Sequence, residues 1–331
     1  EELFALQNEE LWVLGAVTAD LRLLGVLATI APFVAPTILE DLDPGVNLLL
    51  VGGAVLGLVA LVGTWLASGV YAILRYYGFR LVRRGDELRY ERGLLQRYSG
   101  SIPLEKVQTV SLAENVLARQ LGYASVNIGT AGYAPGQTQG QRVQSAVPIA
   151  KRERALSLAR QVEPFGDLSF ERPPKRARVR YVVRYGLVVL GLVGVLGAVH
   201  LATDALPWWP AGVLGLTVVP PAAHLKWANL GYHLGDDHVV TRHGFWVRQT
   251  TVVPYHRVQT VVRSRTVFQR RRDLGTLVVD TASGGGLRGS DAVALDLDAG
   301  RAASLLETVA GRLQGALADR RATRREPETA G

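Results

Sequence analysis

The sequence contains no cysteine and no methionine, and aromatic residues make up only 7% of its 331 residues. Without cysteine, the chain cannot form disulfides, thiolate metal sites or a thiol nucleophile. Because methionine is missing even at position 1, we expect a fragment or a processed product. The opening Glu1-Glu2 segment also lacks the basic start and the small-residue cleavage site of a signal peptide. These absences restrict the chemistry more than the fold.

Charge is missing from four long stretches, although the chain as a whole carries a net charge of +8. The longest stretch runs for thirty-one residues, and the four are Leu23 to Leu39, Pro44 to Leu74, Tyr185 to Thr203 and Ala205 to Leu225. About 20 apolar residues suffice to cross a bilayer as a helix. We therefore predict four spans arranged as two hairpins. Four core helices of a soluble protein would explain the lengths but not the charge distribution described next.

Basic residues are concentrated on one side of these hairpins. All charged residues of the hairpin loops are acidic. The outer flanks carry the basic residues Arg75, Arg80, Arg83, Arg84, Arg172, Lys175, Arg176, Arg178, Arg180, Arg184 and Lys226. Positive charge is retained on the cytoplasmic face of membrane proteins. The prediction is a multi-pass protein of the cell membrane with both soluble segments and both termini in the cytoplasm.

The two soluble segments are copies of one unit. At an offset of 151 residues, Arg97 falls on Arg248, Arg119 on Arg270, and Val107-Gln108-Thr109-Val110 on Val258-Gln259-Thr260-Val261. In this alignment a small insertion brings Leu121-Gly122 onto Leu274-Gly275. So many matches in one register indicate a repeat of hairpin plus domain.

Each copy has a β-rich body and a helical end. Short alternating or β-branched runs predict strands at 79–82, 87–91, 107–112 and 125–129, and again at 239–241, 251–253, 258–262 and 277–280. Apolar residues at helical spacing predict terminal helices over 151–162 and 299–317, with Asp298 as the N-cap of the second. The predicted fold is a small α+β barrel or sandwich of about seven strands closed by a C-terminal helix.

Several motifs give the repeat a family resemblance. Arg92-Gly93-Leu94-Leu95, Ile102-Pro103-Leu104-Glu105-Lys106-Val107-Gln108, Arg119-Gln120-Leu121-Gly122 and Thr130-Ala131-Gly132 resemble the bacterial pleckstrin-homology-like (PH-like) domain of membrane-flanked proteins, the YdbS and YdbT type. The resemblance implies two PH-like barrels, each preceded by a transmembrane hairpin. It implies no settled biochemical activity. Because members with several copies are common, a further PH-like domain upstream of Glu1 is also expected.

The predicted organisation has seven segments. They are an N-terminal cytoplasmic segment at 1–20, transmembrane hairpin 1 at 21–75, PH-like domain 1 at 76–165, a basic linker at 166–180, transmembrane hairpin 2 at 181–226, PH-like domain 2 at 227–318 and a disordered tail at 319–331.

Residues shared by the two copies fall into two groups. The first is expected to fix backbone geometry, because glycine and proline restrict or permit particular turns: Gly93, Pro103, Gln108, Gly122, Thr130, Gly244, Pro254, Gln259, Gly275 and Thr281. The second consists of arginines that could bind an anionic headgroup or a partner carboxylate, since guanidinium suits both: Arg97, Arg119, Arg248, Arg270, Arg271 and Arg272. A solvated arginine is the alternative for each.

No pattern for catalysis, a cofactor or a metal recurs in both copies. His233, His238, His243 and His256 belong to the second copy alone, and we interpret them as surface histidines of hairpins. The triplet Gly284-Gly285-Gly286 lacks the surroundings of a phosphate-binding loop.

We therefore expect a non-enzymatic membrane scaffold with no cofactor. Its partners would be membrane lipids and a protein of unknown identity, with a homo-oligomer as a further option and no role for nucleic acid. A transporter, or an accessory subunit of a transport or stress-resistance complex, is the alternative. The spans argue against it, because their only ionisable residues are His200 and His224 near the ends.

Overall fold

A computed structural model describes residues 1–17, 44–131, 143–204, 207, 209–283 and 292–325. These residues form two compact units. Unit 1 contains residues 1–13, 74–177 and 227–331, and unit 2 contains residues 14–73 and 178–226.

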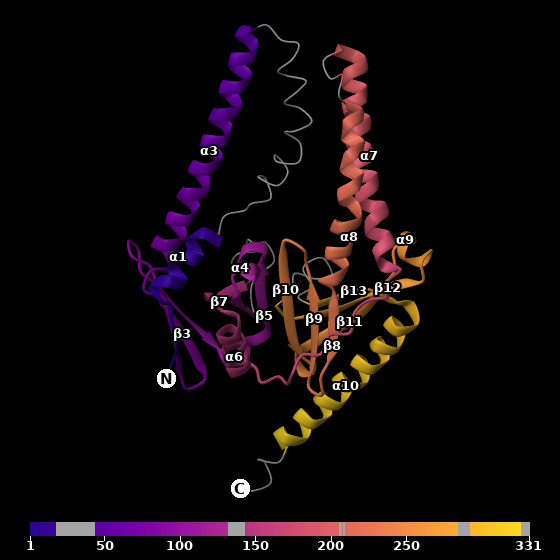
Figure 1. Cartoon of the computed structure of the whole chain (residues 1–331). Helices are drawn as coiled ribbons and strands as arrows, with labels where there is room; N and C mark the ends of the chain where they lie inside the picture. The colour runs from indigo at the N-terminus through magenta and orange to yellow at the C-terminus, as the bar shows by residue number, and fades with distance from the viewer. Residues whose placement is uncertain (18–43, 132–142, 205–206, 208, 284–291, 326–331) are drawn as a thin grey trace. The chain divides into compact units, whose positions relative to one another are not determined.

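Unit 2 holds the helices with apolar surfaces. They are α3 (Pro44–Tyr76), α7 (Ala177–Thr203), the 3-10 helix η2 (Trp209–Val218) and α8 (Val219–Ala228) (Figure 1). The last residues of α3 and α8 and the first residue of α7 belong to unit 1. Two stretches of the described residues are long and apolar enough to cross a membrane, Val55–Tyr76 and Ala177–Thr203. Exposed leucines and valines cover both. Such surfaces suit a lipid environment better than water.

The other two predicted spans have different outcomes. The span at 23–39 lies outside the described residues. The span at 205–225 is divided between η2 and α8 rather than forming one α-helix. Its sequence contains Pro210, Pro220 and Pro221, which cannot donate backbone hydrogen bonds inside a helix.

The first copy in unit 1 contains six strands and receives a seventh from the N-terminus. The strands are β2 (Arg80–Arg84), β3 (Glu87–Arg92), β4 (Tyr98–Pro103), β5 (Val107–Asn115), β6 (Tyr123–Thr130) and β7 (Val143–Lys151). The helices are η1 (Leu104–Lys106), α4 (Val116–Gln120) and α6 (Arg152–Val162). The segment at 1–20 contributes β1 (Glu2–Ala5), which pairs with β2, and then α1 (Asn8–Val17).

In the second copy the described residues repeat this order with six strands, where about seven were expected. They are β8 (Gly231–Leu234), β9 (His238–His243), β10 (Val247–Pro254), β11 (Val258–Ser264), β12 (Leu274–Thr281) and β13 (Ala292–Asp298). The helices are η3 (Tyr255–Arg257), α9 (Val267–Arg270) and α10 (Ala299–Arg325). Asp298 caps α10 as predicted, since its Oδ1 accepts from Gly300 N at 3.0 Å and Arg301 N at 3.3 Å. The helix continues to Arg325, beyond the predicted end at Leu317, and therefore includes part of the expected tail.

One detail of the predicted alignment is wrong. Strands β6 and β12 begin at Tyr123 and Leu274, so the offset of 151 persists through this region without an insertion. The structural equivalent of Gly122 is therefore Asp273, and both have a positive φ, 75° and 51°. Gly275 lies inside β12, where it corresponds to Ala124. Sequence matching favoured the shared Leu-Gly pair over the shared backbone conformation.

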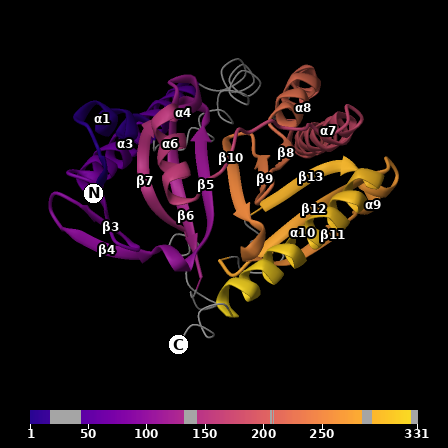
Figure 2. The ribbon, with the colours of Figure 1, turned by 90° about the horizontal axis from the view of Figure 1, so that it is seen from below.

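The described strands of unit 1 form three sheets. They have the orders β1-β2-β3-β4, β7-β6-β5-β10-β9-β8 and β11-β12-β13. The six-stranded sheet joins the copies, because β5 of the first pairs antiparallel with β10 of the second; Figure 2 shows these strands side by side. The hydrophobic core of the first copy also includes Val240 and Val252 from the second. The two copies are thus one structural unit.

Candidate functional site

One end of unit 1 is defined by its connections to the helices. Residues Leu74 to Tyr76 end α3, Ala177 begins α7, and Trp227 and Ala228 end α8, all within unit 1. Strands β2 and β8 start at this end and run away from it, and their antiparallel partners β3 and β9 run back toward it. The turns that follow β3 and β9 therefore lie at this end as well. We call this side the helix-proximal end. It also carries α4 and α9, which follow β5 and β11.

Apolar side chains occupy the helix-proximal turn of each copy. Leu94 N donates to Leu74 O at 3.0 Å, and Gly93 N donates to Tyr77 O at 2.9 Å, which fixes the turn beside the end of α3. Leu95 at its tip is 83% exposed. In the second copy the equivalent residue is Trp246, which is 43% exposed. Exposed tryptophan and leucine side chains are typical of protein surfaces that lie at the membrane interface.

Glycine makes both turns possible. Gly93 and Gly244 have φ values of 108° and 101°, and a Cβ at either would overlap a backbone carbonyl, that of Gln96 or Val247. Only glycine adopts this conformation without steric cost. Two of the predicted structural residues therefore position the apolar tips.

A buried carboxylate lies near these turns, where β5 meets β10. Glu114 is directly opposite Arg248 in the register, and its Oε2 accepts from Arg248 Nη2 at 2.7 Å and Nε at 2.8 Å. Its Oε1 accepts from Arg152 Nε at 3.1 Å, at the start of α6. The Glu114 side chain is only 4% exposed. One carboxylate thus joins both copies.

Three further arginines surround this ion pair. Burial and, to a smaller extent, the charges of Arg248, Arg172 and Arg152 together lower the pKa of Arg242 to about 10, against the opposing effect of Glu114. Burial and Arg248 likewise lower the pKa of Arg119. We call these residues the arginine cluster: Arg119, Arg152, Arg172, Arg242 and Arg248.

The arginine cluster has unused donors. Among the described residues, Arg119 Nη1 and Arg242 Nε are buried and have no hydrogen-bond partner. The guanidinium of Arg242 lies 4.2 Å from the ring centroid of Phe170, which shields one of its faces. Five cations around one carboxylate leave positive charge uncompensated. Guanidinium donors of this kind suit phosphate and carboxylate groups.

The predicted arginines do not share one site. Arg119 and Arg248 lie in the arginine cluster. Arg97, the equivalent of Arg248, is exposed just before β4, with no ion pair to any described residue. Arg270 ends α9, and Arg271 and Arg272 follow it; the first two are exposed and the third is half-buried. Glu114, Arg152, Arg172 and Arg242 were not among the predicted site residues.

The remaining repeated residues lie near the turns that join β4 to β5 and β10 to β11, or at the ends of β6 and β12. Pro103 and Pro254 end β4 and β10 and precede the 3-10 turns that enter β5 and β11. Gln108 is buried and its Nε2 donates to Lys106 O at 3.4 Å, whereas Gln259 is exposed. Thr130 and Thr281 are buried at the ends of β6 and β12. The same motif therefore has different surroundings in the two copies.

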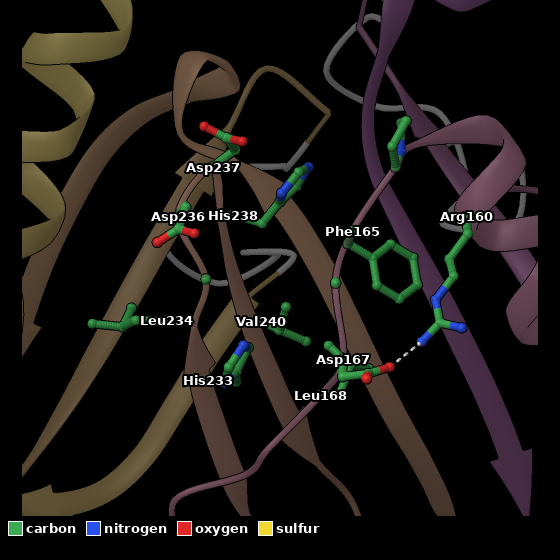
Figure 3. Close-up of a pocket in the computed structure, with 13 residues that line it drawn as sticks. Arg160, Phe165, Asp167, Leu168, His233, Leu234, Asp236, Asp237, His238 and Val240 are labelled. Carbon is green, nitrogen blue, oxygen red and sulfur yellow. Dashed lines mark hydrogen bonds and ion pairs between the residues drawn. The ribbon is translucent and has the colours of Figure 1, made fainter.

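An open pocket of about 660 Å³ lies away from the helix-proximal end, between the segment after α6 and the β8–β9 hairpin (Figure 3). Arg160 Nη2 donates to Asp167 Oδ1 at 3.1 Å on one wall. His238 is buried and its Nε2 lies 2.9 Å from Glu163 Oε1, so its interpretation as a surface histidine was wrong. In the described part of the chain, no three acidic or histidine side chains are grouped to hold a metal. The triplet at 284–286 lies outside the described residues.

Comparison with known proteins identifies relatives of the chain. The profile of the bacterial PH domain matches residues 22–165 and 185–313. The transmembrane protein YdbT of Bacillus subtilis (strain 168) is 25% identical over 232 residues, which cover 70% of this chain and 46% of YdbT. The chain therefore spans about half the length of that relative. No solved structure shows significant similarity.

Proposed function

The chain belongs to the bacterial PH domain family, and on this premise we propose that it is a non-enzymatic membrane protein that binds anionic lipid headgroups at the helix-proximal end of unit 1. The arginine cluster carries the proposal. It presents five guanidinium groups around one buried carboxylate and has buried donors without partners.

A phosphate group would complete the hydrogen bonding of this cluster. Arg119 Nη1 and Arg242 Nε would gain an acceptor, and the charge that lowers the pKa of Arg242 would be compensated. Near an anionic bilayer surface each basic residue contributes about 1 kcal/mol. The cluster would thus favour headgroups with a phosphate and no compensating amine.

The apolar tips supply the second part of the interaction. Full burial of a leucine side chain contributes about 1.5–3 kcal/mol, and Leu95 is almost fully exposed to solvent. Trp246 has one of the two ring types that are enriched at the headgroup level. Insertion of the tips would place the arginine cluster beside the lipid phosphates.

Attachment to helices makes weak binding effective. A binding site held beside a membrane meets headgroups at high effective concentration, so a modest intrinsic affinity is sufficient. The basic flanks Arg75, Arg80 and Arg176 favour the cytoplasmic leaflet as the bound surface.

The absence of cysteine provides a direct test. The full chain, with Leu95→Cys or Trp246→Cys labelled by an environment-sensitive fluorophore, is inserted into bilayer discs of phosphatidylcholine with or without phosphatidylglycerol. We expect blue-shifted emission at both tips that increases with phosphatidylglycerol, and a smaller response in Arg119→Gln/Arg242→Gln. Arg160→Gln, at the opposite end, should leave the response unchanged.

A label at Asp236→Cys on the β8–β9 hairpin is the positional control, because it lies away from the helix-proximal end. Equal emission from the tip labels in discs with and without phosphatidylglycerol would overturn headgroup binding. So would an equally large response at position 236.

A further inference from the structure

The junction between β5 and β10 is a contact between non-equivalent edges. In the repeat, β5 corresponds to β11 and β10 corresponds to β4, so the first copy presents one kind of edge and the second copy the other. A heterologous contact of this type leaves one edge of each kind unused and can in principle add further units.

Strand β4 is the unused equivalent of β10. It is the last strand in the order β1-β2-β3-β4, with no further strand beside it among the described residues. Most of β10 is buried, from Thr250 to Pro254, whereas Tyr98, Ser99 and Ser101 of β4 are exposed. Unpaired edge strands present free backbone donors and acceptors to another chain.

The charge that marks the junction is also repeated at this edge. Arg248, which pairs with Glu114 across the junction, has Arg97 as its equivalent, and Arg97 has no ion pair to any described residue. Applying the offset of 151 to the junction register places a residue equivalent to Glu114 opposite Arg97, and one equivalent to Leu112 opposite Ser99.

We propose that β4 is a docking edge for the β5-type strand of a further PH-like domain that carries a carboxylate opposite Arg97. Backbone pairing supplies the attachment, as in other cases of strand addition. The ion pair selects the partner and fixes the register. The proposal is independent of lipid binding at the arginine cluster.

A second copy of this chain is a poor occupant. Its unused β5-type strand is β11, and the residue equivalent to Glu114 is Arg265. Docking would place Arg265 opposite Arg97, and like charges directly opposite destabilise paired strands. The occupant is therefore a PH-like domain with aspartate or glutamate at that position.

The probe for this edge is a synthetic peptide with the β5 sequence, Val107 to Asn115, in which Leu112 is replaced by cysteine. The full chain carries Ser99→Cys. Opposite residues of antiparallel strands have Cα atoms about 4.5–5.5 Å apart, within the range for a disulfide. Under mild oxidation we expect a peptide adduct at position 99. The control variant, Arg263→Cys on the edge strand β11, should form little adduct.

Charge reversal tests the role of Arg97. A peptide with Glu114→Arg should form the adduct about tenfold less efficiently, since an attractive cross-strand pair becomes repulsive. Arg97→Glu in the chain should restore it with that peptide. Arg271→Glu changes the net charge equally at an exposed site away from β4 and should restore nothing. Equal adduct formation at positions 99 and 263, or insensitivity to both reversals, would overturn the proposal.

Discussion

At the scale of single residues, Glu114 is the point on which the junction depends. It is almost fully buried and accepts from arginines of α6 and β10. Removing one partner of a buried ion pair leaves uncompensated charge and costs about 3–5 kcal/mol. We expect Glu114→Gln to destabilise unit 1 by about this amount, as measured by pulse proteolysis of the full chain in detergent.

Sulfate should restore part of this loss, because an anion can occupy the arginine cluster in place of the carboxylate. The control is Glu153→Gln on the exposed surface of α6, which should change stability by less than about 0.5 kcal/mol. Equal stability of the two variants would show that Glu114 does not hold the copies together.

The sequence could identify residues but not their surroundings. Arg97 and Arg248 match in the repeat, yet one is exposed and the other is bonded to Glu114. Glu114 itself has no match, since its equivalent is Arg265, so a search for shared residues passes over it. A comparison of the two copies therefore cannot identify a site that forms where two non-equivalent strand edges meet.

At the scale of elements, α9 carries a buried polar network that its counterpart lacks. Gln269 Nε2 donates to Thr276 Oγ1 and Asp296 Oδ1, both at 2.8 Å, and its Oε1 accepts from Thr266 N at 2.9 Å. In α4 the equivalent residue is Ala118, which is also buried. The two copies thus fill the same position with opposite chemistry.

We expect Gln269→Ala to destabilise α9 and β12 by about 2–4 kcal/mol, because it leaves buried polar groups with fewer partners. Hydrogen exchange should show faster exchange in residues 266–281, with residues 115–130 of the first copy unchanged. Arg271→Ala, on the exposed side of the same turn, is the matched control. Equal exchange rates for residues 266–281 in Gln269→Ala and Arg271→Ala would contradict a stabilising role for the network.

The sequence predicted elements well where periodicity was strong. Strands near 79–82, 87–91, 107–112 and 125–129 in the first copy, strands near 239–241, 251–253, 258–262 and 277–280 in the second, and both terminal helices are confirmed. It gave no range for β7, β8 or β13. It also did not predict β4, whose sequence Tyr-Ser-Gly-Ser-Ile-Pro has little β-branched character, or β1, which precedes the first hairpin. Strands defined mainly by their neighbours carry weak signals of their own.

At the scale of the whole molecule, charge at the edges of β4 and β11 should limit self-association. Arg97→Glu would place a carboxylate opposite Arg265 of a second chain and so reproduce the junction with its charges reversed. We expect this variant to form concentration-dependent multimers in light-scattering measurements, whereas the wild type stays at one size. Arg97→Ala should associate less than Arg97→Glu.

Reversal at both edges gives the control. Arg97→Glu/Arg265→Glu restores like charges and should return the chain to the size of the wild type. Persistence of multimers in this double variant would show that association does not use these edges.

Neither periodicity nor composition could predict that β5 pairs with β10. Strand alternation sets which face is buried, but not which edge of another domain lies beside it. The sequence therefore predicted two domains of one family, whereas the structure joins them in one sheet.

The junction also imposes an order on synthesis. About 130 residues separate the end of β5 from the start of β10, and they include α7, η2 and α8. At about 5–20 residues per second, a ribosome needs on the order of 10 s to supply the missing strand. During that interval the nascent first copy exposes an unpaired edge. The time needed to synthesise the residues between β5 and β10 thus governs how long the protein is vulnerable to mispairing.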